Sequence, residues 1–208
     1  MFRKVGYNMI QYDLNQIQDV VRAFQQSKII AMPTDTVYGV GVLFDRYEDL
    51  EKLKHCKHRP ETKPIPVMVA DINQMEIVAK VDERVRKLVE AFLPGPMTLV
   101  VPIKDDMDPR FTNGLKTIAI RIPDSKFILD VLQQLGKPLF VTSANQSGQK
   151  TALTYDDVLE QLPNIDGLVM GTCQQLQAST IVDCTGTDLK ILREGPISLS
   201  QIQSALCE

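Results

Sequence analysis

The sequence predicts an α/β protein with a mixed, twisted β-sheet and flanking helices. Short apolar runs typical of buried strands are interspersed with amphipathic segments at helical spacing, without strict β-α-β alternation. With 208 residues, of which 44% are apolar and 24% charged, the chain can bury a substantial core. We therefore expect one domain over residues 1–208.

Helices are predicted from apolar spacing and from capping patterns. Asn15 is the expected N-cap of the first helix, Gly136 ends the fifth, and Thr154 with Asp157 has the pattern of a capping box. The predicted helices cover residues 15–25, 47–56, 71–79, 82–92, 127–135, 154–162 and 198–206.

Strands are predicted where short apolar runs are bounded by turn residues. The predicted strands cover residues 28–32, 67–70, 97–102, 117–122, 138–141, 168–170, 179–183 and 189–192. Between the first two, Gly39 and Gly41 flank apolar residues, a pattern that predicts close backbone approach to a partner or ligand.

The most distinctive stretch of the chain is the basic segment 54–66. Its four fixed cations, Lys54, Lys57, Arg59 and Lys63, stand against the single acid Glu61, while the whole chain has a net charge of −3. Concentrated cations attract phosphate, carboxylate or nucleic acid, and prolines stiffen this loop. The alternative is a solvated helix end, because cations favour the C-terminus of a helix.

Bulk features exclude several classes of protein. No apolar run approaches 18 residues, so no membrane span is expected, and residues 1–8 lack the apolar segment of a signal peptide. Four scattered cysteines form no C-x-x-C pair and are typical of reduced thiols in the cytoplasm. The net charge argues against a dedicated nucleic-acid-binding protein. His55 and His58 lack a third ligand nearby, so no protein metal site is predicted.

Recognised phosphate and hydrolase motifs are missing from the sequence. There is no complete dinucleotide fingerprint, no Gly-Lys-Ser/Thr and no Gly-x-Ser-x-Gly elbow. A nucleotide would have to be held by scattered cations and by hydroxyls beside strands. Taken singly, such hydroxyls more often cap helices or close turns. Likewise Arg121 and Arg193, each at a strand end, taken alone favour rim salt bridges.

Seven motifs follow one another along the chain and cover about residues 28–197. They are Pro33–Gly39, Lys57–Pro60, Leu93–Thr98, Ile120–Pro123, Ser143–Gly148, Ser179–Asp183 and Leu192–Gly195. Together they resemble the YrdC-like family of L-threonylcarbamoyladenylate synthases, in its short single-domain form. The resemblance implies a twisted mixed sheet with a concave ligand-binding face.

This resemblance implies a nucleotidyl transfer that serves the threonylcarbamoyladenosine modification of tRNA. L-threonine, bicarbonate and ATP, with Mg²⁺ bridging phosphate oxygens, give threonylcarbamoyl-AMP and pyrophosphate. The carbamate of threonine attacks the α-phosphate, so the enzyme needs no nucleophile of its own. The product would pass to a separate tRNA threonylcarbamoyl-transfer complex.

The resemblance also assigns residues. Lys57 and Arg59 form its lysine-x-arginine signature and are the expected catalytic pair. The expected ATP side comprises Arg59, Lys63, Thr117, Ser143, Asn145, Thr151 and Arg193, and the expected threonine side comprises Thr36, Arg121, Val141 and Ser179, with Arg121 as the carboxylate clamp.

Three departures from the family pattern bear on these assignments. Met68 stands where longer relatives often have a histidine near threonine, Ala178 precedes Ser179 where many have glutamate or proline, and Lys150-Thr151-Ala152 replaces serine-proline-threonine. Two other functions stay open. One is an RNA-binding module that uses the basic segment, although no aromatics are interleaved with it. The other is a diverged paralogue without threonine activity.

Overall fold

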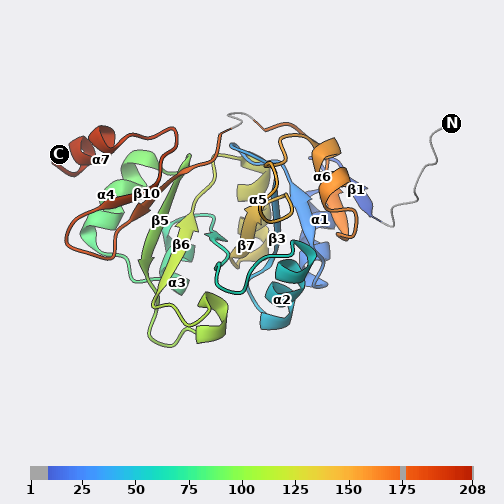
Figure 1. Cartoon of the computed structure of the whole chain (residues 1–208), viewed down its shortest axis with the longest axis horizontal. Helices are drawn as coiled ribbons and strands as arrows, with labels where there is room; N and C mark the ends of the chain where they lie inside the picture. Colours follow the sequence, from blue (N-terminus) through green and yellow to red (C-terminus); the bar gives the residue numbers. More distant parts are fainter. Residues whose placement is uncertain (1–8, 174–176, 208) are drawn as a thin grey trace.

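The computed structural model describes residues 9–173 and 177–207, and within them ten strands form one sheet (Figure 1). The strand order is β1-β8-β2-β3-β7-β4-β6-β5-β9-β10. The strands are β1 (Ile10–Tyr12), β2 (Ile30–Met32), β3 (Gly39–Leu43), β4 (Val67–Met68), β5 (Met97–Pro102), β6 (Thr117–Arg121), β7 (Leu139–Ser143), β8 (Gly167–Val169), β9 (Thr180–Asp183) and β10 (Lys190–Arg193).

Strand pairing confirms the predicted mixed sheet. The pairs β1–β8, β2–β8, β4–β6 and β5–β9 are parallel. The pairs β2–β3, β3–β7, β4–β7, β5–β6 and β9–β10 are antiparallel. Chain segments far apart in sequence therefore become neighbours in the middle of the sheet.

All seven predicted helices are present; α2 has its predicted ends, and the others differ slightly at one end or both. They are α1 (Ile17–Gln25), α2 (Tyr47–Cys56), α3 (Ile72–Val78), α4 (Glu83–Phe92), α5 (Lys126–Leu135), α6 (Tyr155–Gln161) and α7 (Leu199–Cys207). The expected N-cap at Asn15 is wrong, because α1 starts later and its cap, Gln16, makes no side-chain capping bond. The Thr154–Asp157 capping box and the left-handed Gly136, with φ of 62°, are confirmed.

Three elements were not predicted: β1, β3 and the short 3-10 helix η1 (Pro109–Thr112). Strand β1 has only three residues and is defined by its pairing with β8. In β3 the glycines allow close approach of the neighbouring strand: a Cβ at Gly41 would lie 2.4 Å from Phe140 O. The predicted close backbone approach is therefore confirmed for Gly41, and its partner is strand β7.

Alternating side chains divide the sheet into two faces. Ala31, Val40 and Phe140 point into one apolar cluster, which includes residues of α2, α3, α4 and α6. Leu139 and Val141 point to the opposite face, where α1 and α5 pack. In Figure 1, β1 and α7 lie at opposite ends of the molecule, with β5 and β6 between α4 and the central strands. The face that carries α1 and α5 continues across β6, β5 and β9 as the wall of a cavity.

Candidate active site

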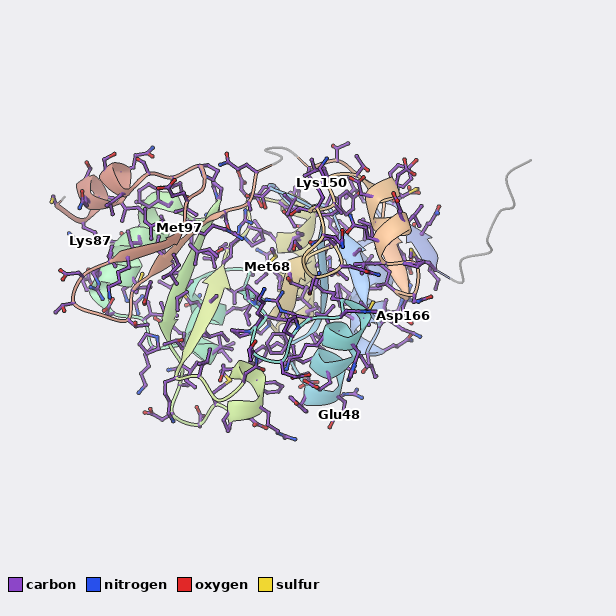
Figure 2. All side chains as sticks on the ribbon, in the orientation of Figure 1. Glu48, Met68, Lys87, Met97, Lys150 and Asp166 are labelled. Carbon is purple, nitrogen blue, oxygen red and sulfur yellow. The ribbon has the colours of Figure 1, made fainter. Side chains whose placement is uncertain are left out.

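A cavity of about 400 Å³ lies on the sheet face that bears Met68 and Arg121. Met68 sits near the middle of the molecule in Figure 2. Of the residues expected at the site, the structure brings together in the lining Thr36, Arg59, Arg121, Val141, Ser143, Thr151, Ser179 and Arg193. They include residues from six of the seven sequence motifs, which the fold therefore brings together on one concave surface.

The expected residues Lys57, Lys63, Thr117 and Asn145 are outside this lining, as far as the described residues show. Lys63 is exposed, and its carbonyl accepts a bond from Arg59 Nε at 2.9 Å. Asn145 is buried, and its Nδ2 donates to Gln146 O at 2.8 Å and Gln149 O at 3.0 Å. Asn145 therefore shapes the loop that follows β7.

Lys57 is a buried cation beneath that same loop. Its Nζ donates to the carbonyls of Ser143 and Asn145, and Ser147 N donates back to Lys57 O at 3.0 Å. Burial, followed by the positive charge of Arg59, lowers the pKa of Lys57 to about 7. Lys57 therefore connects the basic segment to the loop that carries Ser143, and it holds that loop in place.

Lys54 takes no part in the cavity. Its buried ammonium donates to Glu51 Oε1 at 2.7 Å and Asn113 Oδ1 at 2.9 Å, and lies 3.4 Å from Glu61 Oε2. One of the four cations of the basic segment is therefore neutralised by internal ion pairs and is not available to a ligand. These bonds tie the loop around Glu61 to η1 and so support the position of Arg59.

Arg59 is half-buried at the cavity wall. Its Nη2 donates to Pro64 O at 2.7 Å, and its Nη1 lies 3.4 Å from Thr142 Oγ1. Burial lowers the pKa of Arg59, yet arginine stays charged in proteins. Within residues 9–173 and 177–207 no carboxylate pairs with Arg59, so its charge is available to an anion.

Arg121 is the most constrained cation of the cavity. Nη2 lies 2.6 Å from Asp35 Oδ2, Nη1 donates to Thr36 Oγ1 at 2.8 Å, and Nε donates to Gly95 O at 3.0 Å. Burial lowers the pKa of Arg121 and the charge of Asp35 opposes that shift. The prediction of a rim salt bridge for Arg121, made from its position at a strand end alone, is wrong because this ion pair is buried.

Arg193 and Ser179 form a second polar group in the cavity. Arg193 Nε donates to Ser179 O at 3.0 Å, and Nη2 donates to Ser179 Oγ at 3.1 Å. Thr98, which was not among the expected site residues, also lines the cavity, with Oγ1 2.8 Å from Ser179 Oγ. Strand alternation could have identified it, because the core residues Met97 and Leu99 flank Thr98 in β5 and leave its side chain on the opposite face.

Thr117 lies in a smaller cavity of about 240 Å³ that adjoins the first. The two cavities share Pro64, Pro66, Val100, Ala119 and Leu192, so they form one continuous hollow. The lining of the smaller part is mainly apolar, and it includes Phe111 and Ile118. An uncharged planar group fits this part, whereas charged groups fit the larger one.

The larger cavity has a strongly positive character. Its described lining contains Arg59, Arg121 and Arg193 and no acidic residue. Asp35 contacts the lining residue Arg121, and its carboxylate is paired with that guanidinium. Three arginines and several hydroxyls, without a carboxylate, suit a ligand that carries more than one anionic group.

Comparison with known proteins identifies the family. Residues 22–195 match the Sua5/YciO/YrdC family model, which is described as "Telomere recombination". The chain belongs to the Sua5/YciO/YrdC family. It is 33% identical over 195 residues to a threonylcarbamoyl-AMP synthase of Bacillus subtilis, covering 92% of this chain and 56% of the relative. A threonylcarbamoyl-AMP synthase of Photobacterium profundum is 34% identical over 152 residues, covering 72% of this chain and 82% of the relative.

The fold of the Sua5/YciO/YrdC family is also found in solved structures. Pyrococcus abyssi Sua5 complexed with L-threonine superimposes with a TM-score of 0.88 at 28% identity, covering 95% of this chain and 60% of that chain. This chain thus spans just over half the length of the Bacillus and Pyrococcus relatives.

Among the described residues no helix is long and apolar enough to cross a membrane. In the same residues, no three His, Cys, Asp or Glu side chains gather in a way that would hold a metal ion.

Proposed function

We propose that this member of the Sua5/YciO/YrdC family makes threonylcarbamoyl-AMP and pyrophosphate from L-threonine, bicarbonate and Mg–ATP. The observation that carries the proposal is the cavity itself, which holds three arginines and several hydroxyls but no acidic side chain. A reaction between two anionic substrates needs positive charge and positioning more than it needs a protein nucleophile.

The proposed reaction balances without help from a protein side chain. The amine of threonine and bicarbonate give a carbamate and water. A carbamate oxygen then attacks the α-phosphorus of ATP, a new P–O bond forms, and the bond to the bridging oxygen breaks. Pyrophosphate leaves with that electron pair. Threonylcarbamoyl-AMP is the product, and it would serve a downstream transfer complex that modifies tRNA.

Arg59 and the loop around Ser143 are the proposed phosphate side. Arg59 has no described acidic partner and lies against Thr142 and Pro64, at the end of the cavity near β7. The adjoining apolar cavity with Thr117 would receive the adenine base. Mg²⁺ would enter with ATP, bound to phosphate oxygens and water, since the described lining offers it no carboxylate.

Arg121, Thr36 and Ser179 are the proposed threonine side. The guanidinium of Arg121 keeps two N–H groups beyond the three that Asp35, Thr36 and Gly95 engage. Those groups would bind the carboxylate of threonine. Met68 and Val141 supply an apolar wall for its methyl group, a contact that can favour threonine over serine by about 1–3 kcal/mol. L-threonine in the Pyrococcus abyssi Sua5 structure supports this substrate.

The structure weakens the case for an RNA-binding module. Lys54 and Lys57 of the basic segment make internal bonds, so neither presents a free charge to an RNA backbone. A diverged paralogue without threonine activity would still need an explanation for the intact arrangement of Thr36, Arg121 and Ser179.

A pyrophosphate-release assay with each substrate omitted in turn tests the proposal. We expect release only when threonine, bicarbonate, ATP and Mg²⁺ are all present, with labelled bicarbonate entering a product that contains AMP. Release that is unaffected by omitting threonine would contradict the synthase function. Salt-sensitive binding of RNA without any pyrophosphate would favour the binding module.

A further inference from the structure

Thr98 and Ser179 are brought together by the sheet although 81 residues separate them in the chain. Thr98 lies in β5, beside β9 in parallel register, and Ser179 directly precedes β9. Both side chains are buried, and their hydroxyl oxygens are 2.8 Å apart. The pairing of β5 with β9 therefore determines this contact.

The Ser179 hydroxyl has two described partners, Arg193 and Thr98, so one of its three hydrogen-bonding positions stays open. A hydroxyl has one proton to donate and two lone pairs to accept with. Arg193 Nη2 donates to Ser179 Oγ at 3.1 Å, which uses one lone pair. If Thr98 donates to the second lone pair, the proton of Ser179 has no described acceptor and points into the cavity, where it is free for a ligand.

In the reverse arrangement Ser179 would donate to Thr98. The proton of Ser179 would then be unavailable to a ligand, and the proton of Thr98 would have no acceptor among the described residues. An anion beside Ser179 attracts the free proton and selects the first arrangement. With such a ligand bound, Thr98 is therefore the donor and Ser179 the group that faces the anion.

Thr36 is prepared in the same way on the other side of the cavity. It accepts from Arg121 Nη1 at 2.8 Å, and its hydroxyl is 3.0 Å from Thr34 Oγ1. Thr34 Oγ1 already accepts from the N–H groups of Thr36 and Val37, at 3.0 and 3.2 Å, and donates to Val37 O at 2.7 Å. Its capacity is used, so the Thr36 proton is also left for the cavity.

We propose that Thr98 is a positioning residue that turns the Ser179 proton toward an anionic group of the bound amino acid. Arg193 donates a hydrogen bond to the Ser179 hydroxyl, and Arg121 donates one to the Thr36 hydroxyl. The cavity then offers a ligand two hydroxyl donors, each hydrogen-bonded to an arginine. This inference rests on the proposed function, because it takes threonine as the ligand beside Ser179.

Steady-state pyrophosphate release by Thr98→Val and Thr98→Ser tests the inference. Thr98→Val keeps the shape but removes the hydroxyl, and we expect the KM for threonine to rise about tenfold or more, as for a lost hydrogen bond to a charged group. The KM for ATP should change less than about twofold, because Thr98 makes no described contact with the proposed phosphate side and distant sites act independently. Thr98→Ser should restore the threonine KM.

Thr180→Val is the matched control. Thr180 is the next residue after Ser179 and is buried, but its hydroxyl donates to Ile197 O at 2.9 Å on the other side of the strand. We expect this variant to lose thermal stability while its threonine KM stays near that of the wild type. An equal rise of the threonine KM in Thr180→Val would show a general structural effect and would overturn the role of Thr98.

The remaining outcomes separate the two proposals. An unchanged threonine KM in Thr98→Val, or a Thr98→Ser variant as impaired as Thr98→Val, overturns the positioning role while the synthase function stands. A wild-type protein that releases no threonine-dependent pyrophosphate overturns the synthase function, and the role of Thr98 with it.

Discussion

Asp35 and Arg121 form a buried ion pair, with 2.6 Å between Asp35 Oδ2 and Arg121 Nη2. The pair connects the loop after β2 with the end of β6, 86 residues away. Oδ1 of Asp35 is buried and has no partner among the described residues. The carboxylate therefore acts through Arg121, whose guanidinium it holds in place beside the cavity.

Asp35→Asn should destabilise the protein and weaken threonine binding together. Removing one charge leaves Arg121 buried without its counter-ion, which typically costs about 3–5 kcal/mol. Urea unfolding measures the free energy of unfolding, and calorimetry with threonine measures binding. The control is Asp105→Asn, since Asp105 pairs with Lys80 at the surface and its loss should change the free energy of unfolding little. Equal effects of the two variants would contradict a special role of the buried pair.

Arg121→Lys should weaken threonine binding and leave ATP binding largely intact. Lysine keeps the positive charge but cannot reach Asp35, Thr36 and Gly95 at once as the planar guanidinium does. Separate titrations with threonine and with ATP measure the two affinities. Loss of both affinities by the same factor would mean that Arg121 is not specific to the threonine side.

Arg59→Ala should reduce ATP affinity by about 2–5 kcal/mol, the usual effect of losing one partner of a buried charged contact. Calorimetric titration with Mg–ATP measures it. The matched control is Lys63→Ala, because the Lys63 side chain is exposed and its carbonyl, which binds Arg59, is retained. We expect the control to lose about 1 kcal/mol or less. Unchanged ATP affinity in Arg59→Ala would remove this residue from the phosphate side.

Lys57→Met should reveal a pH-dependent stability difference. Burial lowers the pKa of Lys57 from 10.5 to about 7 in the folded protein. Between these values the unfolded chain binds more protons than the folded one, so Lys57 makes the free energy of unfolding rise with pH. The difference between wild type and Lys57→Met should therefore shift in favour of the wild type from about pH 7 to pH 10, by at most about 1.4 kcal/mol per pH unit.

Urea unfolding of both proteins at several pH values measures that difference. Below pH 7 the difference should level off, because Lys57 is then charged in both states. A flat difference for Lys57→Met from about pH 7 to pH 10 would contradict the lowered pKa of Lys57.

Local sequence signals determined much of the secondary structure. Helix α2 was predicted with its observed ends, and the Thr154–Asp157 capping box and the left-handed Gly136 were read directly from residue types. These features depend on contacts within a few residues, so the sequence contains all the partners. The ordered motifs likewise identified the family, because each motif is a short run of residues that can be recognised in the sequence without knowledge of the strand order.

The partners of the site residues were decided only by the tertiary structure. Thr98 meets Ser179 across 81 residues because the sheet order places β5 beside β9. Arg121, at the end of β6, meets Asp35 of the loop between β2 and β3 across 86 residues. The tertiary structure also distinguishes cations that are equivalent in the sequence: Lys54 forms internal ion pairs, while Arg59 lines the cavity. Charge can be read along a chain, but burial and hydrogen-bond partners exist only once distant strands have packed.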